Sequence, residues 1–210
     1  FDNCRAFIKR VDVDYYTDAD LNVSLSLLDV DDQIGNAARG DIKVTALVKI
    51  FKKMKLDTGE SLGYGPVRLP ETDMHTTAMW MTLSEDSAAL YGKDSLQNGM
   101  LGISNALRII APLYLMCSSR DIAVSYQVKS PFTQKPTLIL YDNCPGGVGL
   151  SEKAFLMRVQ LLRHAKEMIL HCGCQNGCPS CVGPIGEVGR DGKQMALKLI
   201  DHLLDNSPND

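Results

Sequence analysis

The first 85 residues alternate between apolar and polar positions and are rich in β-branched side chains, a pattern typical of β-strands. Short polar segments that contain glycine, asparagine or aspartate divide this region and are typical of turns. The pattern predicts strands at 5–15, 21–30, 41–56 and 76–83. It predicts turns at 31–32, 35–36, 39–41 and 57–59, and a loop at 63–66.

Beyond residue 85 the apolar positions recur every three or four residues, which predicts helices. Pro112 is expected to end or kink the first of them, because proline lacks a backbone N–H. The apolar stripe of the second helix continues directly into Cys172. The predicted elements of this part are helices at 95–110, 151–171 and 194–204, a strand at 122–128 and a buried strand at 137–141.

These patterns together predict an α+β fold in two parts. A β-rich segment at 1–85 is followed by an α/β domain at 86–210. The chain has 210 residues, of which 45% are hydrophobic, so it can bury a sizeable core and is not expected to be disordered. A formal net charge of −3 argues against a dedicated, strongly basic nucleic-acid-binding protein but leaves room for a local basic surface.

The sequence contains neither a signal peptide nor an apolar run of the roughly 20 residues that a membrane-spanning helix needs. We therefore expect no membrane partner and a cytoplasmic location. The odd number of cysteines, seven, fits a reducing compartment, where clustered cysteines bind metal more often than they form disulfides. Because the chain begins with Phe1 and a predicted strand follows almost at once, we expect a piece of a longer protein or a processed one.

Four cysteines within ten residues, in a CxC and a CxxC pair, are the strongest chemical signal in the chain. Short turns of this kind allow one backbone to supply four thiolates to a tetrahedral zinc ion. Disulfides, an iron–sulfur cluster and free thiols remain alternatives, because sulfur ligands alone do not decide the metal. His171 and Cys144 are further candidate ligands. The predicted ligands are Cys172, Cys174, Cys178 and Cys181.

Two features suggest contact with nucleic acid. Lys49, Phe51, Lys53 and Lys55 lie at alternate positions of a predicted strand, so they share one face that could contact phosphates, although a solvated strand face is the simpler interpretation. Gly146 and Gly147 belong to a glycine-rich loop before a helix, where backbone amides can bind an anion. That loop matches neither a P-loop nor a dinucleotide-binding motif, so a tight turn is the alternative.

Enzymatic alternatives have weaker support. Asp121 and Asp142 each border a predicted strand and could together bind magnesium for nuclease chemistry, but aspartates at strand ends usually belong to turns. Cys144 could act as a nucleophile only if His164 or His171 lay beside it as a base. We expect no catalytic residue in this chain.

Several strings of residues together resemble one family. They are Leu138–Asp142, the Pro145-Gly-Gly-Val-Gly149 loop, the Cys172-Gly-Cys174 pair and the segment Gly177–Val182, and in the β-rich part the stretches 11–16 and 58–70. This combination resembles the C-terminal zinc-binding domain of MrfA-type superfamily-two DEAD/DEAH-box DNA repair helicases. The resemblance covers nearly the whole chain, and the cysteine segment with the glycine loop is its most specific part.

The resemblance implies a structural Zn²⁺ on the four cysteines and a parent protein that is an ATP-dependent 3′–5′ helicase moving on single-stranded DNA in DNA repair. The chain contains no Walker A lysine and no DEAD or DEAH box, so ATP and Mg²⁺ would enter only through motor domains outside it. The implied partners are those motor domains and single-stranded or damaged DNA, which this domain would help to position. The alternatives are a metal-dependent nuclease-like domain and a protein-interaction module.

Overall fold

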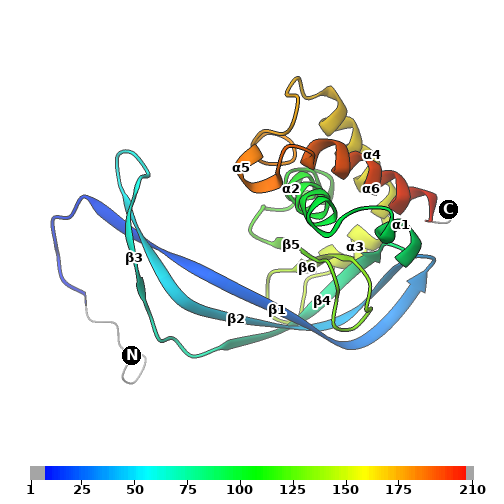
Figure 1. The fold of residues 1–210 in the computed structure, drawn as a ribbon. Coiled ribbons are helices and arrows are strands. Elements are labelled where there is room, and N and C mark those ends of the chain that lie inside the picture. The colour runs from blue at the N-terminus through cyan, green and yellow to red at the C-terminus, as the bar shows by residue number, and fades with distance from the viewer. Residues whose placement is uncertain (1–7, 207–210) are drawn as a thin grey trace. The chain divides into compact units, whose positions relative to one another are not determined.

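The computed structural model describes residues 8–206, except for the side chains at positions 20 and 21. It confirms the α+β class, with long antiparallel strands first and helices later (Figure 1). The strands are β1 (Tyr15–Ile34), β2 (Ala37–Lys55), β3 (Ser61–Pro66), β4 (Thr72–Thr82), β5 (Ile122–Gln127) and β6 (Thr137–Asp142). The helices are α1 (Glu85–Ala89), α2 (Lys93–Leu115), α3 (Leu150–Leu156), α4 (Arg158–His171), α5 (Ile185–Val188) and α6 (Gly192–Asp205).

The strands form one sheet in the order β1-β2-β4-β6-β5, and β3 pairs separately with β2. β6 runs antiparallel to both of its neighbours: Leu140 lies opposite Met79 of β4 and opposite Val124 of β5. All six residues of β6 are buried, which confirms the prediction of a buried strand. Because β6 is flanked on both sides, its C-terminal end is a well-fixed point from which the glycine loop begins.

Helix α2 is the centre of the hydrophobic core, where it packs against β5, α4 and α6 (Figure 1). The predicted apolar stripe is buried as expected. Two glycines on the same helix allow α6 to come close: a Cβ atom at Gly99 would lie 2.6 Å from Leu199, and one at Gly102 would lie 3.1 Å from that of Ala196. The stripe comprises Leu96, Met100, Ile103, Leu107 and Ile110.

Pro112 does not end α2, which continues to Leu115. The helix ends at Met116, whose φ of 59° is in the left-handed region, and the N–H groups of Met116 and Cys117 both donate to the Pro112 carbonyl. The predicted helix at 151–171 is interrupted at Met157, where α3 gives way to α4. No helix in the described part of the chain is both long and apolar enough to cross a bilayer.

Two of the four predicted turns are wrong because glycine and aspartate also occur inside long strands. Asp31 and Asp32 lie within β1, an edge strand of the sheet, where their side chains reach water. The predicted turn at 39–41 lies within β2. A Cβ atom at Gly40 would be 2.1 Å from the carbonyl oxygen of Asp29, so glycine is required there by the closeness of the neighbouring backbone.

The remaining differences concern the β-rich part. The predicted loop at 63–66 is most of strand β3, which pairs with β2. Of the predicted strand at 5–15, residues 5–7 lie outside the described residues, and β1 begins only at Tyr15. The turns at 35–36 and 57–59 are confirmed.

The chain divides into two compact units, each described here by itself. One consists of the described residues of Phe1–Ser24 with Thr45–Asp73, and the other of those of Leu25–Val44 with Met74–Asp210. The second unit contains the helices and the cysteine cluster. β4, from before residue 85, pairs in it with β6. The division at residues 85 and 86 expected from the sequence stays a prediction.

Candidate metal centre

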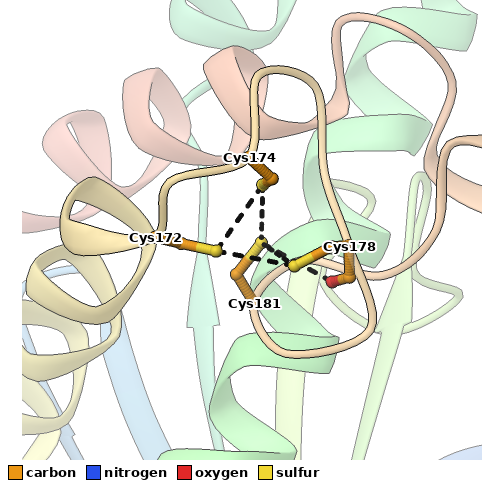
Figure 2. Close-up of side chains that lie close together, drawn as sticks. All are labelled: Cys172, Cys174, Cys178 and Cys181. Atoms are coloured by element: carbon orange, nitrogen blue, oxygen red, sulfur yellow. Dashed lines mark hydrogen bonds between the residues drawn. The ribbon is translucent and has the colours of Figure 1, made fainter.

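The four clustered cysteines come from the end of α4 and the loop that follows it. Cys172 is the C-cap of α4 and has extended backbone dihedral angles, so the chain leaves the helix at the first cysteine. Figure 2 shows the four sulfur atoms directed toward one common point. Cys181 is fully buried in the core, and the other three are partly buried. As predicted, the helix stripe delivers the first cysteine to the cluster.

The distances between the sulfur atoms match a tetrahedral metal site. The Sγ atom of Cys172 lies 3.6 Å from that of Cys174 and 3.5 Å from that of Cys178, and Cys181 lies 3.5 and 3.6 Å from the same two atoms. A tetrahedron with zinc–sulfur bonds of about 2.3 Å has edges of about 3.8 Å. All four atoms lie within 4.8 Å of one another. The residues present therefore fit a closed, four-coordinate zinc ion.

The thiols of the cluster are free, which excludes the disulfide alternative for the described cysteines. Their surroundings shift the pKa values of Cys172 and Cys181 in opposite directions. A hydrogen bond from the Cys174 backbone N–H, helped by the neighbouring thiols, lowers the pKa of Cys172 to about 7. Burial raises the pKa of Cys181 to about 12. Because zinc binds the thiolate form, binding at this site must displace protons, above all from Cys181.

Glycines shape the loop that carries the last two cysteines. Gly177 has a φ of 138°, and a Cβ atom there would lie 2.8 Å from the Gly183 carbonyl oxygen. The N–H groups of Cys181 and Gly183 both donate to the carbonyl of Cys178, which closes the turn. From α2, the side-chain amide of Asn105 donates to the Val182 carbonyl at 2.9 Å. The loop is thus fixed by its own backbone and by the central helix.

A buried lysine holds the other pair of cysteines. The Nζ atom of Lys193, near the start of α6, donates to the carbonyl oxygen of Cys172 at 2.7 Å and to that of Cys174 at 2.6 Å. Its own backbone N–H donates to the Asn176 carbonyl at 3.3 Å. Lys193 is only 9% exposed. Sequence reasoning missed this residue, which lies directly before the predicted last helix at 194–204 but within the helix that forms.

The glycine loop is organised by an aspartate of the chain itself. The carboxylate of Asp142 at the end of β6 is fully buried and accepts three backbone hydrogen bonds. The donors are the N–H groups of Val148 (2.6 Å), Leu150 (3.1 Å) and Ser151 (2.6 Å). With its oxygens used in this way, Asp142 is not available as a magnesium ligand, which argues against the nuclease-like alternative. Asp121 is exposed and accepts from the Ser118 N–H.

The predicted anion contacts of the loop stay predictions, and its geometry does not favour them. The N–H of Gly146 donates to the His75 carbonyl and that of Gly147 to the Cys144 carbonyl. A cavity of about 190 Å³ lies beside the loop, and Asp31 and Glu152 line it together with Arg39. Glu152 and Arg39 form an ion pair at 2.6 Å. A phosphate in this cavity would therefore meet two carboxylates.

The three predicted lysines lie on β2, in the first unit. Lys49 and Lys53 are exposed and Lys55 is half-buried. A shift in the pairing with β3 between Lys53 and Met54 interrupts the alternation before Lys55. The ring of Phe51 packs over Gly65 of β3, where an added Cβ atom would lie 2.8 Å from the ring.

The remaining sequence candidates lie apart from the cluster. His171 points its Nδ1 back to the Glu167 carbonyl at 2.8 Å, and His164 stacks on Tyr114 of α2. Among the described residues only the four cysteines gather as a metal-binding group, so Cys144 is not a fifth ligand there. The carbonyl of Cys144 accepts a hydrogen bond from Thr76, which fits a structural role.

Comparison with known proteins shows which family this cysteine cluster resembles. Residues 103–182 match the family described as the MrfA Zn-binding domain. The chain is 41% identical over 207 residues to the uncharacterized ATP-dependent helicase YprA of Bacillus subtilis (strain 168), covering 97% of this chain and 27% of YprA. It is 31% identical over 113 residues to an uncharacterized protein of Methanocaldococcus jannaschii, covering 50% of this chain and 99% of that protein.

Solved structures agree. The crystal structure of the DUF1998 helicase MrfA bound to DNA superposes with a TM-score of 0.70 at 42% identity, over 91% of this chain and 26% of that one. A further crystal structure of the DUF1998 helicase MrfA gives a TM-score of 0.64 at 35% identity, over 87% of this chain and 24% of that one. The chain thus spans about a quarter of the length of the helicases it matches. Zinc is its structural cofactor, and the chain contains the zinc-binding domain of MrfA-type helicases.

Proposed function

We propose that the chain is the C-terminal accessory module of an ATP-dependent DNA helicase that acts in DNA repair, and that Cys172, Cys174, Cys178 and Cys181 hold its zinc ion. The observation that carries this proposal is the closed set of four sulfur atoms at tetrahedral spacing at the junction of the main helices. A zinc ion with four thiolate ligands has no open position, so it supplies structure rather than catalysis. ATP hydrolysis would belong to motor domains outside these residues.

Residues in and around the cluster connect it to three helices. Cys172 joins the cluster to α4, Asn105 joins it to α2 and Lys193 joins it to α6. The metal site therefore links three separate helices, α2, α4 and α6. We propose that this rigid junction presents a surface to the motor domains or to the DNA. A cytoplasmic site of action follows from the same chemistry, because free thiolates persist in a reducing compartment.

An exposed apolar surface at the end of α2 supports contact with the motor domains. Leu113 is 69% exposed and Met116 is 87% exposed. Ile109, Leu113 and Met116 follow one another at helical spacing, and exposed apolar patches of this kind often mark interaction sites. If this module stimulates DNA unwinding by the motor domains, Leu113→Glu should weaken that stimulation without changing the zinc content of the module. Stimulation equal to that of the unaltered chain would exclude this surface.

For DNA, we propose contact through Lys49, Lys53 and Lys55 and, with less geometric support, through Gly146 and Gly147. What supports the lysines is that residues 45–56 contain no acidic residue and that Lys49 and Lys53 are exposed. Single-stranded or damaged DNA is the proposed ligand. Lys53→Glu should weaken binding of a fluorescent single-stranded DNA and make the binding constant less dependent on salt concentration. Lys198→Glu on α6 should have little effect on either quantity. Equal losses in both variants would indicate non-specific attraction.

The zinc assignment is tested by metal analysis of the purified chain. One zinc per chain is expected, and Cys178→Ser should lower that content and destabilise the second unit, because zinc binding can contribute on the order of 10 kcal/mol to folding. Cys117→Ser is the matched control, since Cys117 lies outside the cluster. Full zinc content and unchanged melting in Cys178→Ser would overturn the assignment. Cleavage of single-stranded DNA with magnesium would instead revive the nuclease alternative.

A further inference from the structure

Lys193 combines three properties. Its side chain is buried, it lies on the apolar side of a helix, and its ammonium group contacts the backbone of two cysteines of the cluster. On α6 it precedes three buried residues at spacings of three, four and three positions. These residues are Ala196, Ile200 and Leu203.

The position on α6 explains how the side chain reaches the cluster. A residue on the buried stripe of a helix must direct its side chain toward the core. The aliphatic stem of lysine can pack there, and its charged tip extends beyond the apolar contacts to the Cys172–Cys174 turn. A leucine or methionine would satisfy the stripe equally well. The ammonium group is therefore the feature that needs an explanation.

The charge of the cluster can explain the ammonium group at this position. A buried ammonium group is costly unless negative charge lies nearby, because burial disfavours the charged form. Within the described residues the Lys193 ammonium group donates to two neutral carbonyls, and no carboxylate pairs with it. The cluster beside it would supply negative charge, since four thiolates and one zinc ion carry a net charge of −2. Lysine and cluster thus compensate one another.

We propose that Lys193 is a positioning residue of the zinc site. Its two hydrogen bonds hold the Cys172–Cys174 turn so that both sulfur atoms face the metal, and its charge offsets part of the negative charge of the four thiolates. Groups of this kind around a metal site orient its ligands and tune its affinity. This inference rests on the proposed assignment of the four cysteines and extends that site to a fifth residue, from a different helix.

The test measures zinc affinity and zinc release in three variants of the full chain. Lys193→Met keeps an unbranched stem and removes the charge, Lys193→Arg keeps the charge and alters the geometry, and Lys198→Met is the control on the exposed side of α6. Competition with a chromogenic chelator gives the dissociation constant. Lys193→Met should weaken zinc binding about 10- to 100-fold, the range found when such outer groups are removed. Lys193→Arg should lie between it and the unaltered chain.

Cobalt substitution separates positioning from simple loss of folding. With saturating Co²⁺, Lys193→Met should still show the visible absorption of a tetrahedral thiolate site, but it should release the metal faster than Lys198→Met. Zinc affinity equal to that of the unaltered chain would overturn the inference. If Lys193→Met fails to fold even with saturating zinc, Lys193→Gln replaces it. A zinc affinity of Lys193→Gln equal to that of the unaltered chain would then overturn the proposed role of the charge. If the unaltered chain binds no zinc, the proposed function fails instead.

Discussion

Asp142 offers a quantitative test of how the glycine loop is held. The substitution Asp142→Asn changes almost no volume, but it replaces one carboxylate oxygen by an NH₂ group. In the structure one oxygen accepts from Val148 and Leu150 and the other from Ser151, with distances of 2.6, 3.1 and 2.6 Å. An asparagine oxygen can satisfy only one of these two sets. The NH₂ group would then face at least one buried N–H donor.

The expected loss can be worked out from these contacts. A hydrogen bond to a charged group contributes about 1.5–3 kcal/mol, and a buried donor left without an acceptor costs about 1–3 kcal/mol. Losing one such bond and leaving one N–H unpaired should lower the free energy of unfolding by about 3–5 kcal/mol. For a chain of this size that corresponds to a fall in melting temperature of about 6–20 °C.

The same substitution at Asp121 is the control. Asp121 is exposed and accepts one backbone hydrogen bond, at 2.9 Å, so Asp121→Asn should cost only about 0.5–1 kcal/mol. Urea denaturation followed by circular dichroism, together with thermal melting at equal zinc saturation, measures both variants. Equal stability of the two variants would refute the conclusion that Asp142 anchors the loop, and a large effect at Asp121 alone would reverse it.

Three further predictions concern the same unit. Gly147→Ala should lower the free energy of unfolding by about 2–3 kcal/mol in urea denaturation, because its φ is 69° and a Cβ atom would lie 2.3 Å from the Thr77 hydroxyl oxygen. Gly146→Ala, with a φ of 79° and open space around it, should cost only about 1–2 kcal/mol, and the reverse order would contradict this account. The Ser95 hydroxyl lowers the pKa of Asp191, so the stability this carboxyl contributes is present above its ordinary pKa and lost as the pH falls. Asp191→Asn should therefore reduce stability at pH 7 and make acid titration of the melting temperature less steep below about pH 4.

The fold was predictable where a pattern is local and repeated. The stripe from Leu96 to Ile110 predicts α2 because every third or fourth side chain enters the core. The apolar run that became β6 was recognisable because that strand is buried on both faces. The long strands β1 and β2 were harder, since Asp31 and Gly40 suggest turns by composition. Their strand conformation depends on a neighbouring strand, which the local sequence does not contain.

The same distinction applies to the metal centre. The four cysteines lie within ten residues, so their spacing alone predicts that they can converge. Lys193 and Asn105 reach the cluster from other helices, and only the tertiary packing brings them there. One signal could have identified Lys193: a lysine directly before a predicted helix, at a position that extends the apolar stripe of that helix, in a chain with a cluster of thiols. The anchoring role of Asp142 was hidden for the same reason, because its acceptors serve a turn whose geometry the sequence does not specify.

Gly102 of α2 affects the metal centre, although it does not belong to the cysteine cluster. A methyl group at Gly102 would lie 3.1 Å from the Cβ atom of Ala196 on α6 and 3.3 Å from that of Val182, the residue after Cys181. Any larger side chain there would separate α6 and the cysteine loop from α2 at the same time. Since α6 carries Lys193, the interhelical distance also sets how far the ammonium group extends over the Cys172–Cys174 turn. The absence of a side chain at Gly102 thus contributes to the geometry of the metal site, although this glycine contributes no atom to it.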